Sequence, residues 1–425
     1  MPSSHWALDR LHLRNVRCFR DAEIQFHEKV TVVVGGNASG KTTLMEAMAS
    51  LTYGADEGLV EFPLRSGDAS GQMLLFEKGR DVAAARWDSK QETRTRLPND
   101  RYMFLYGRYR SIPAPVQLFE DRRTTDAENL DELANHASIF RAAALTRPNK
   151  PLMNLLPGYL RGLWFGRASD PRLEAIWQRL NRALGEIDSS LSEVRVEERL
   201  DPAAPQIIRN GLPFELAQLS DGYQTILAIV LDLMLRYAYL FYEGDPLEGN
   251  AAVCIDEIDL HLHPRWQRTI LPQLTSLFPG TQFVVTTHSP IVVQAAIDGG
   301  FGVVRLLEED GAVTAQPLST RLAKSLRGAE VGSVLFEDHL FGIDSRFSVE
   351  FGAVEKLVDD LQTKVSRDEA TDADYRSLKK GIEKLEEQVA KEDRRRADGS
   401  TMGRLVRMQA DFVKALAEEL KRSRS

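Results

Sequence analysis

A glycine-rich segment, Gly35–Thr43 (GGNASGKTT), constrains this chain more than any other part of it. A β-branched apolar run, Val32–Val34, precedes it and helix-forming residues from Leu44 follow it, so the sequence predicts a strand, a loop and a helix. In such a loop, backbone N–H groups and the positive end of the helix point at an anion, and glycines let the backbone approach it. The residues expected to bind a nucleotide's phosphates are Gly35, Gly36, Asn37, Ala38, Ser39, Gly40, Lys41, Thr42 and Thr43.

Two residues of this segment have side-chain chemistry of their own. Lys41 has the position from which an ammonium group reaches the β- and γ-phosphates of a nucleotide such as ATP. The hydroxyl of the next residue, Thr42, is expected to hold Mg²⁺. An ordinary turn that matches the spacing by chance is the alternative, and the strand and helix predicted on either side argue against it.

A second apolar run, Ala252–Ile255, ends in two carboxylates, Asp256 and Glu257. Parallel α/β sheets gather their ligands at the carboxyl ends of the strands, so we expect this pair close to the glycine-rich segment. Asp256 would complete the Mg²⁺ shell, generally through water. Glu257 would orient and deprotonate the attacking water. By itself the pair is equally consistent with a plain strand end; together with the glycine-rich segment it predicts ATP hydrolysis.

Two further segments extend the predicted site. Phe283–Thr287 is expected to form a buried strand, and His288 follows it ahead of a proline that suits a helix start. Leu219–Gln224 (LSDGYQ) precedes an apolar helix, and its Ser220 and Gly222 would lie at a helix N-terminus that can bind a phosphate. A plain loop with a helix cap is the alternative for this second segment.

Two histidines, His261 and His263, follow the acidic pair at alternate positions. Alternate histidines can share a metal ion, but no cysteine or third histidine lies nearby in the sequence to complete a shell. We therefore favour histidines that hydrogen-bond within a turn.

Composition narrows the class of protein. The acidic residues outnumber the basic ones by 62 to 54, so the chain has no overall positive field, and any nucleic-acid binding must use a local patch. Cys18 and Cys254 lie in apolar surroundings, which suits buried thiols in a reducing compartment. The first 20 residues lack the apolar core of a signal peptide, and the longest apolar run, Ile226–Leu235, is interrupted by Asp232. We expect a cytoplasmic protein without membrane segments.

The chain is expected to have four parts. Residues 1–111 form one lobe with the glycine-rich segment, and residues 112–213, with many prolines and a helical apolar stripe, form an inserted helical subdomain. Residues 214–318 form a second lobe that ends in a β-hairpin. Residues 319–425 form a helical extension that serves as a docking or assembly platform.

The extension carries three short amphipathic seams, in residues 351–365, 375–389 and 405–416. Each is too short for an independent coiled coil, so a small packed bundle is expected. The basic run Arg394–Arg396 is interpreted as an exposed linker rather than a nucleic-acid site.

Several of these motifs resemble those of the RecF, SMC and OLD group of ABC-type ATPases. Leu13–Phe19 (LRNVRCF) resembles the stretch that opens these proteins, and Leu219–Gln224 resembles the ABC signature in its non-transporter form. Asp256–Pro264 (DEIDLHLHP) resembles a run found in bacterial defence and repair ATPases. This chain has Ala38 where the group usually has glycine. The resemblance implies an α/β fold: an ABC-type P-loop ATPase head with an inserted helical subdomain and a C-terminal helical extension.

The resemblance also implies roles for individual residues. Ser220 and Gly222 would face the nucleotide that the phosphate loop of a second subunit holds, so a homodimer, or a higher-order assembly built from it, belongs to the mechanism. Asp259 would cross the dimer interface, and His288 would contact the γ-phosphate and sense hydrolysis. ATP and Mg²⁺ are the implied cofactors. The switch-loop glutamine of the group has only weak candidates, Gln72 and Gln117.

Within the group, the resemblance is strongest to ATPases of antiphage systems: the Septu ATPase, retron-associated ATPases and the PARIS ATPase. It implies an ATPase that senses invasion and controls a partner nuclease or toxin effector, since this chain has no HNH or Toprim nuclease signature of its own. A RecF-like repair ATPase that binds DNA directly, a transporter's nucleotide-binding subunit and a scaffold that binds nucleotide without hydrolysis are the alternatives. Glu257 argues against the scaffold, and the HLHP run argues against the transporter.

Overall fold

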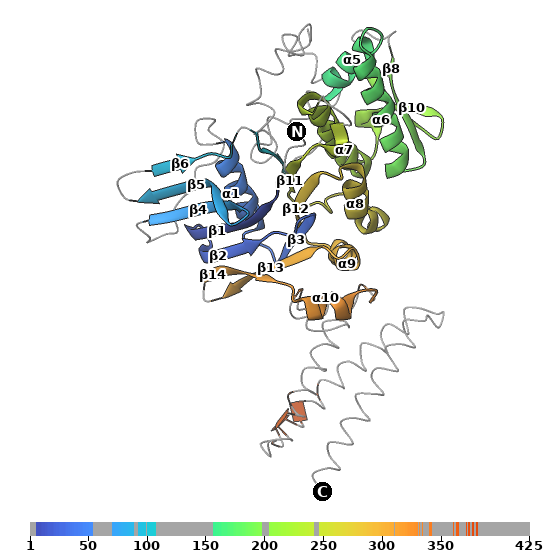
Figure 1. Cartoon of the computed structure of the whole chain (residues 1–425). Helices are drawn as coiled ribbons and strands as arrows, with labels where there is room; N and C mark the ends of the chain where they lie inside the picture. The colour runs from blue at the N-terminus through green and yellow to red at the C-terminus, as the bar shows by residue number, and fades with distance from the viewer. Residues whose placement is uncertain are drawn as a thin grey trace, which may run out of the picture. The chain divides into compact units, whose positions relative to one another are not determined.

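The computed structural model describes residues 6–53, 70–88, 92–98, 100–107, 156–197, 204–241, 246–309, 311–329 and scattered residues between 331 and 380. The chain divides into two compact units, Met1–Val334 and Leu335–Ser425. The first unit carries all the motifs of the predicted nucleotide site. Its elements are labelled in Figure 1.

A six-stranded sheet forms the centre of the first unit, in the order β14-β13-β3-β12-β11-β7. All neighbours pair in parallel except β13 and β14, which form the antiparallel hairpin that the sequence predicted. Both faces of the parallel strands are buried, as their continuous apolar runs require. The bounds are β3 (Val30–Gly35), β7 (Tyr102–Tyr106), β11 (Ala251–Ile255), β12 (Thr281–Thr287), β13 (Gly302–Glu309) and β14 (Ala312–Pro317).

A second, antiparallel sheet lies beside the central one, in the order β2-β1-β4-β5-β6. Helix α1 (Lys41–Tyr53) lies between the two sheets, and its residues Leu44, Met45 and Met48 join apolar side chains of both in one buried cluster. This packing fixes the start of α1, and with it the glycine-rich loop, against the central sheet. The strands are β1 (Leu8–Val16), β2 (Phe19–Gln25), β4 (Ser70–Glu77), β5 (Arg80–Asp88) and β6 (Glu92–Thr95).

Three helices cover the opposite face of the central sheet: α7 (Asp221–Leu240), α8 (Pro264–Leu277) and α9 (Pro290–Asp298) (Figure 1). Tyr237 of α7 is fully buried, packs against Phe104 and Phe278, and shares a hydrogen bond of 2.6 Å with the Thr281 hydroxyl. The unit therefore has three layers: antiparallel sheet with α1, central sheet, and helices.

The described part of the insertion contains a sheet as well as helices. Helices α5 (Leu156–Gly166) and α6 (Pro171–Ile187) agree with the predicted helical stripe, and Trp177 is buried edge-on against Trp164. They are followed by a small antiparallel sheet in the order β10-β9-β8. Its bounds are β8 (Leu191–Glu197), β9 (Ala204–Arg209) and β10 (Leu212–Glu215), with single 3₁₀ turns further on at Leu216–Gln218 and Pro246–Glu248.

A turn between β9 and β10 explains why the purely helical prediction was incomplete. Asn210 and Gly211 have φ angles of 49° and 77°, which is the conformation of a two-residue hairpin turn. Asn-Gly between apolar runs is a strong hairpin signal, and helical periodicity does not include it. As a result, the predicted boundary after residue 213 falls inside β10.

The first unit also extends beyond the predicted boundary after residue 318. Helix α10 (Thr320–Leu326) packs on α9, and the side-chain amide of Gln294 in α9 donates to the backbone carbonyl of Leu326 (3.1 Å). The buried Leu326 explains why the compact unit includes α10. The apolar residues of the three amphipathic seams, together with Arg394–Arg396 and Gln117, lie outside the described residues, so the predictions for them stay predictions.

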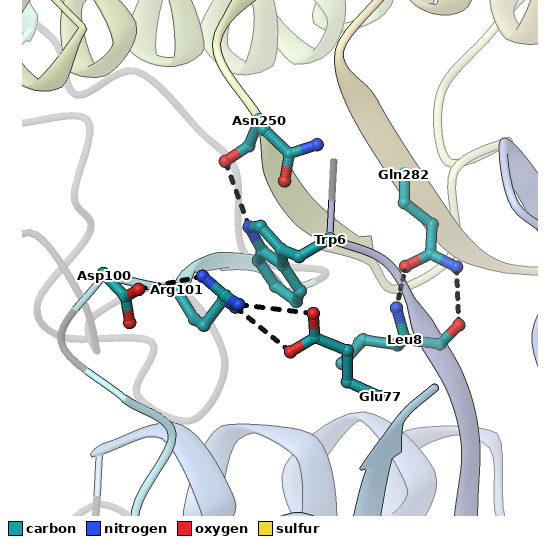
Figure 2. Close-up of polar contacts among 7 residues, drawn as sticks. All are labelled: Trp6, Leu8, Glu77, Asp100, Arg101, Asn250 and Gln282. Atoms are coloured by element: carbon teal, nitrogen blue, oxygen red, sulfur yellow. Dashed lines mark hydrogen bonds and ion pairs between the residues drawn. The ribbon is translucent and has the colours of Figure 1, made fainter. Parts of the chain in front are cut away.

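Polar contacts fasten the first strand to the central sheet (Figure 2). The side-chain amide of Gln282 in β12 accepts from Leu8 N (2.8 Å) and donates to Leu8 O (2.9 Å). It therefore forms with the start of β1 the two hydrogen bonds that the backbone of a neighbouring strand would form. Arg101 forms a two-point ion pair with Glu77, and the Trp6 indole donates to Asn250 O (3.3 Å). These contacts join the two sheets at the end of β12 remote from the glycine-rich loop.

Candidate nucleotide site

The glycine-rich loop runs from the end of β3 to the start of α1. Gly40 has a φ of +89°, and a Cβ atom there would lie 2.7 Å from Cys18 Sγ and 2.8 Å from the Phe19 ring. Glycine is therefore required for both its backbone conformation and its close contact. The stretch Leu13–Phe19, singled out in the sequence, supplies the surface on which the loop rests. Arg17 of the same stretch forms an ion pair with Glu46 of α1.

Lys41 points back into the loop. Its ammonium group donates to Gly35 O and Gly36 O, both at 2.8 Å, and the side chain is 6% exposed. Burial lowers the pKa of Lys41, and the nearby carboxylates of Asp256, Glu257 and Asp259 oppose that effect. The ammonium group thus lies where the loop would surround phosphate oxygens, within electrostatic reach of all three predicted acidic residues.

Thr42 and Asp256 meet across the edge of the sheet. The Thr42 hydroxyl lies 3.2 Å from Asp256 Oδ2, although 214 residues separate them in the chain. Asp256 is 2% exposed and follows the buried strand β11 directly. A hydroxyl and a carboxylate oxygen at this spacing fit Mg²⁺, which is usually held by few protein oxygens together with water and nucleotide phosphates.

Glu257 has a left-handed backbone, with a φ of 49°. For a residue other than glycine this conformation costs about 1–2 kcal/mol, and such strain is concentrated at functional sites. The conformation is maintained by two hydrogen bonds to the end of β12: Glu257 N donates to Thr286 Oγ1 (2.7 Å), and Ile258 N donates to Thr286 O (2.9 Å).

His288 lies in the loop between β12 and α9 and is exposed. Its backbone N–H donates to Asp259 Oδ1 (3.4 Å), and the hydroxyl of Thr287 donates to the same oxygen (2.6 Å). Ser289 caps α9 by accepting from Ile291 N. The structure therefore brings His288 and Asp259 together beside the loop that follows β11.

The signature residues are in a different place. Ser220 is the exposed N-cap of α7, and its side chain makes no capping hydrogen bond. The nearest atoms to a Cβ on Gly222 belong to His261 (2.8 Å) and Trp266, rather than to the glycine-rich loop. Within one chain, the signature segment thus packs on the residues that follow Asp259.

The two histidines after the acidic pair form a turn. His263 is the N-cap of α8, and its Nδ1 accepts from Arg265 N (3.2 Å). His261 has a left-handed backbone, with a φ of 62°, and its carbonyl contacts the signature segment. These contacts agree with the interpretation that the two histidines form part of a turn, in which His263 caps helix α8.

Two residues of the site were not singled out from the sequence. Thr286 and Thr287 follow the apolar run Phe283–Val285 at the end of β12, and their hydroxyls contact Asp256 and Asp259. The available signal was the pair of hydroxyl residues directly before His288. Of the switch-loop candidates, Gln72 lies on β4, opposite Arg14 and Arg86 in the antiparallel sheet.

The parallel sheet, the glycine-rich loop before α1 and the hydroxyl–carboxylate pair at the carboxyl ends of the strands define a P-loop ATPase of the ABC type. The chain belongs to the family described as "AAA domain, putative AbiEii toxin, Type IV TA system", whose family model matches residues 30–294.

The relatives of this chain include probable ATPases of retrons and Septu proteins. A stretch of 103 residues is 40% identical to the "Retron Vc95 probable ATPase" of Vibrio cholerae serotype O1 biovar El Tor, and covers 24% of this chain and 20% of that protein. The "Septu protein PtuA" of Bacillus thuringiensis is 21% identical over 310 residues, which cover 68% of this chain and 73% of that protein. The chain thus spans about a fifth of the length of the retron relative.

Among solved structures, the chain is similar to the "SMC head domain from Thermotoga maritima", with 19% identity and a TM-score of 0.41. The match covers 74% of this chain and 99% of that one.

No helix among the residues that the structure describes is both long and apolar enough to cross a lipid bilayer.

Proposed function

We propose that this chain is the ATP-binding and ATP-hydrolysing subunit of a cytoplasmic bacterial antiphage defence system, in which a nucleotide-dependent homodimer controls a partner nuclease or toxin effector. The observation that supports hydrolysis best is the 3.2 Å contact of Thr42 with Asp256, beside the buried Lys41 and the strained Glu257. The similarity to retron and Septu ATPases supports the defence role.

In the proposed mechanism, the N–H groups of the glycine-rich loop and Lys41 bind the β- and γ-phosphates. Thr42 and Asp256 would together hold the Mg²⁺ ion. Mg²⁺, when bound, neutralises charge on the phosphates. Glu257 accepts a proton from the attacking water, and His288 contacts the γ-phosphate.

The second subunit completes the site. The helix N-terminus that begins at the exposed Ser220 packs through Gly222 on the residues after Asp259 rather than on the glycine-rich loop of its own chain, so the partner's nucleotide is its proposed ligand. Asp259 would then lie at the interface between the subunits. The proposed dimer has two nucleotide sites, each with a glycine-rich loop from one protomer and a signature segment from the other.

The test of this proposal is the variant Glu257→Gln. Removal of the base should lower the rate of ATP hydrolysis by about 10²–10⁴-fold, while ATP binding and ATP-dependent dimerisation persist, because phosphate contacts are unchanged. Lys41→Ala should lose ATP affinity instead. Glu28→Gln, in an exposed loop, is the matched control and should behave as the parent protein does. Hydrolysis by Glu257→Gln at the parental rate would refute the assignment of the base.

The defence role needs a separate measurement. Bacteria that express this chain with the products of its neighbouring genes should resist phage, and Glu257→Gln should abolish that resistance. The RecF-like alternative predicts instead that the isolated protein binds DNA, with an affinity that falls steeply as salt is raised. Strong salt-dependent DNA binding without any protection from phage would favour the alternative.

A further inference from the structure

The two threonines that end β12 lie between the two halves of the nucleotide site. In the central sheet β12 is paired with β3 on one side and β11 on the other, so it separates the glycine-rich loop from the acidic pair. Thr286 and Thr287 are both fully buried. Because successive residues of a strand point to opposite faces, their hydroxyls serve different partners.

Thr286 connects the two members of the acidic pair. Its hydroxyl accepts from Glu257 N (2.7 Å) and donates to Asp256 Oδ1 (2.6 Å). A hydroxyl has a single proton, so the bond accepted from Glu257 N leaves that proton to Asp256. With Oδ1 held in this way, the other oxygen, Oδ2, is the one that faces Thr42.

Thr287 makes the equivalent connection one residue later. Its hydroxyl donates to Asp259 Oδ1 (2.6 Å) and accepts from Ser289 N (2.9 Å). The backbone N–H of His288, which lies between them, donates to the same carboxylate oxygen. The loop after β11 and the loop after β12 are therefore joined at Asp259.

We propose that Thr286 and Thr287 are positioning residues of the ATPase site. Thr286 directs Asp256 toward the metal and sets the strained backbone of Glu257, and Thr287 couples Asp259 to His288. Neither threonine touches nucleotide in this proposal, which rests on the proposed function for the identity of the ligand. Residues that orient the ligands of a metal usually contribute about 10–100-fold to metal affinity or activity.

The test for Thr286 compares valine, which keeps the shape and removes the hydroxyl, with serine, which keeps the hydroxyl. Thr286→Val should lower kcat for ATP hydrolysis by about 10–100-fold, with little change in KM, and Thr286→Ser should restore most of kcat. The matched control is Thr281→Val, which removes another buried hydroxyl from β12, bonded to Tyr237. It should lower stability without changing kcat.

A second readout does not depend on hydrolysis. For a non-hydrolysable ATP analogue, Mg²⁺ should increase affinity less in Thr286→Val than in the parent protein, by about tenfold or more, while affinity in EDTA is unchanged. Thr287→Val should keep this Mg²⁺ effect and weaken ATP-dependent dimerisation, since Asp259 loses the shorter of its hydrogen bonds to the loop after β12.

The outcomes separate the two proposals. If the parent protein does not hydrolyse ATP, the proposed function fails, and the Mg²⁺ readout still judges Thr286. If the parent protein hydrolyses ATP and Thr286→Val has the same kcat and the same Mg²⁺ dependence, the positioning role of Thr286 is refuted. An equal loss of kcat in Thr281→Val would also refute it, because the effect would then come from stability alone.

Discussion

At the scale of single residues, Ala38 is the place where the sequence departs from the glycine usual in this loop. Its φ of 63° is left-handed, a conformation that costs a residue with a Cβ about 1–2 kcal/mol. Glycine would remove that strain, although the greater entropy that it gives the unfolded chain lowers the free energy of unfolding by about 0.4–1 kcal/mol. Ala38→Gly should therefore raise the melting temperature slightly, and the β-branched Ala38→Val should lower it.

The same substitution elsewhere provides the control. Ala175 is exposed in the interior of α6, where glycine costs about 1 kcal/mol relative to alanine. Thermal melts of the nucleotide-free variants should thus shift in opposite directions for Ala38→Gly and Ala175→Gly. A fall in melting temperature for both would mean that the loop is not strained at Ala38.

At the scale of elements, the hydrogen bonds between the Gln282 side chain of β12 and the backbone of Leu8 in β1 are a contact that no local sequence pattern predicts. Gln282 satisfies both backbone groups of Leu8 and also donates to His27 O (3.0 Å), while it is itself 3% exposed. Gln282→Leu would leave these buried groups without their partner. At about 1–3 kcal/mol for each buried group left unsatisfied, the substitution should destabilise the first unit by at least about 2 kcal/mol.

A surface glutamine gives the reference value for this change. Gln178 on α6 is exposed and bonds to Glu174 at the surface, so Gln178→Leu should alter stability by less than about 0.5 kcal/mol. Denaturant titration of both variants compares the two costs. Similar midpoint denaturant concentrations for both variants would show that the stability of the contact between the two sheets does not depend on the Gln282 amide.

At the scale of the whole molecule, the shared site of the proposed dimer predicts complementation between two inactive variants. Ser220→Arg blocks the signature segment, and Lys41→Ala disables the glycine-rich loop. In a mixed dimer, the site made from the loop of the first variant and the signature segment of the second carries neither lesion. An equimolar mixture should therefore recover about a quarter of the parental ATPase activity.

The substitution at Ser220 suits this test, because that side chain is exposed and makes no capping bond whose loss would disturb α7. Subunit exchange must first be demonstrated with labelled protomers. If exchange occurs and the mixture stays inactive, each site is complete within one chain, and the proposed dimer geometry is wrong.

Much of the nucleotide site could be predicted from the sequence, because its parts are local. The spacing from Gly35 to Thr42 requires a loop between a strand and a helix, and an apolar strand before Asp256 directs that carboxylate to the end of a parallel sheet. In the structure the two segments meet, since the Thr42 hydroxyl lies 3.2 Å from Asp256 Oδ2. Residues with a strong local signal were thus identified without coordinates.

Only the tertiary structure assigned partners to residues with no such signal. Thr286, Thr287 and Gln282 are ordinary strand residues in the sequence, and their importance comes from neighbours on other strands, which periodicity does not specify. Likewise, the packing of α10 on α9 placed the end of the first unit at Val334, beyond the change in composition. Local chemistry determined where the glycine-rich loop and the acidic pair lie in their own segments, whereas the strand order β3-β12-β11 decided which side chains on other strands contact them.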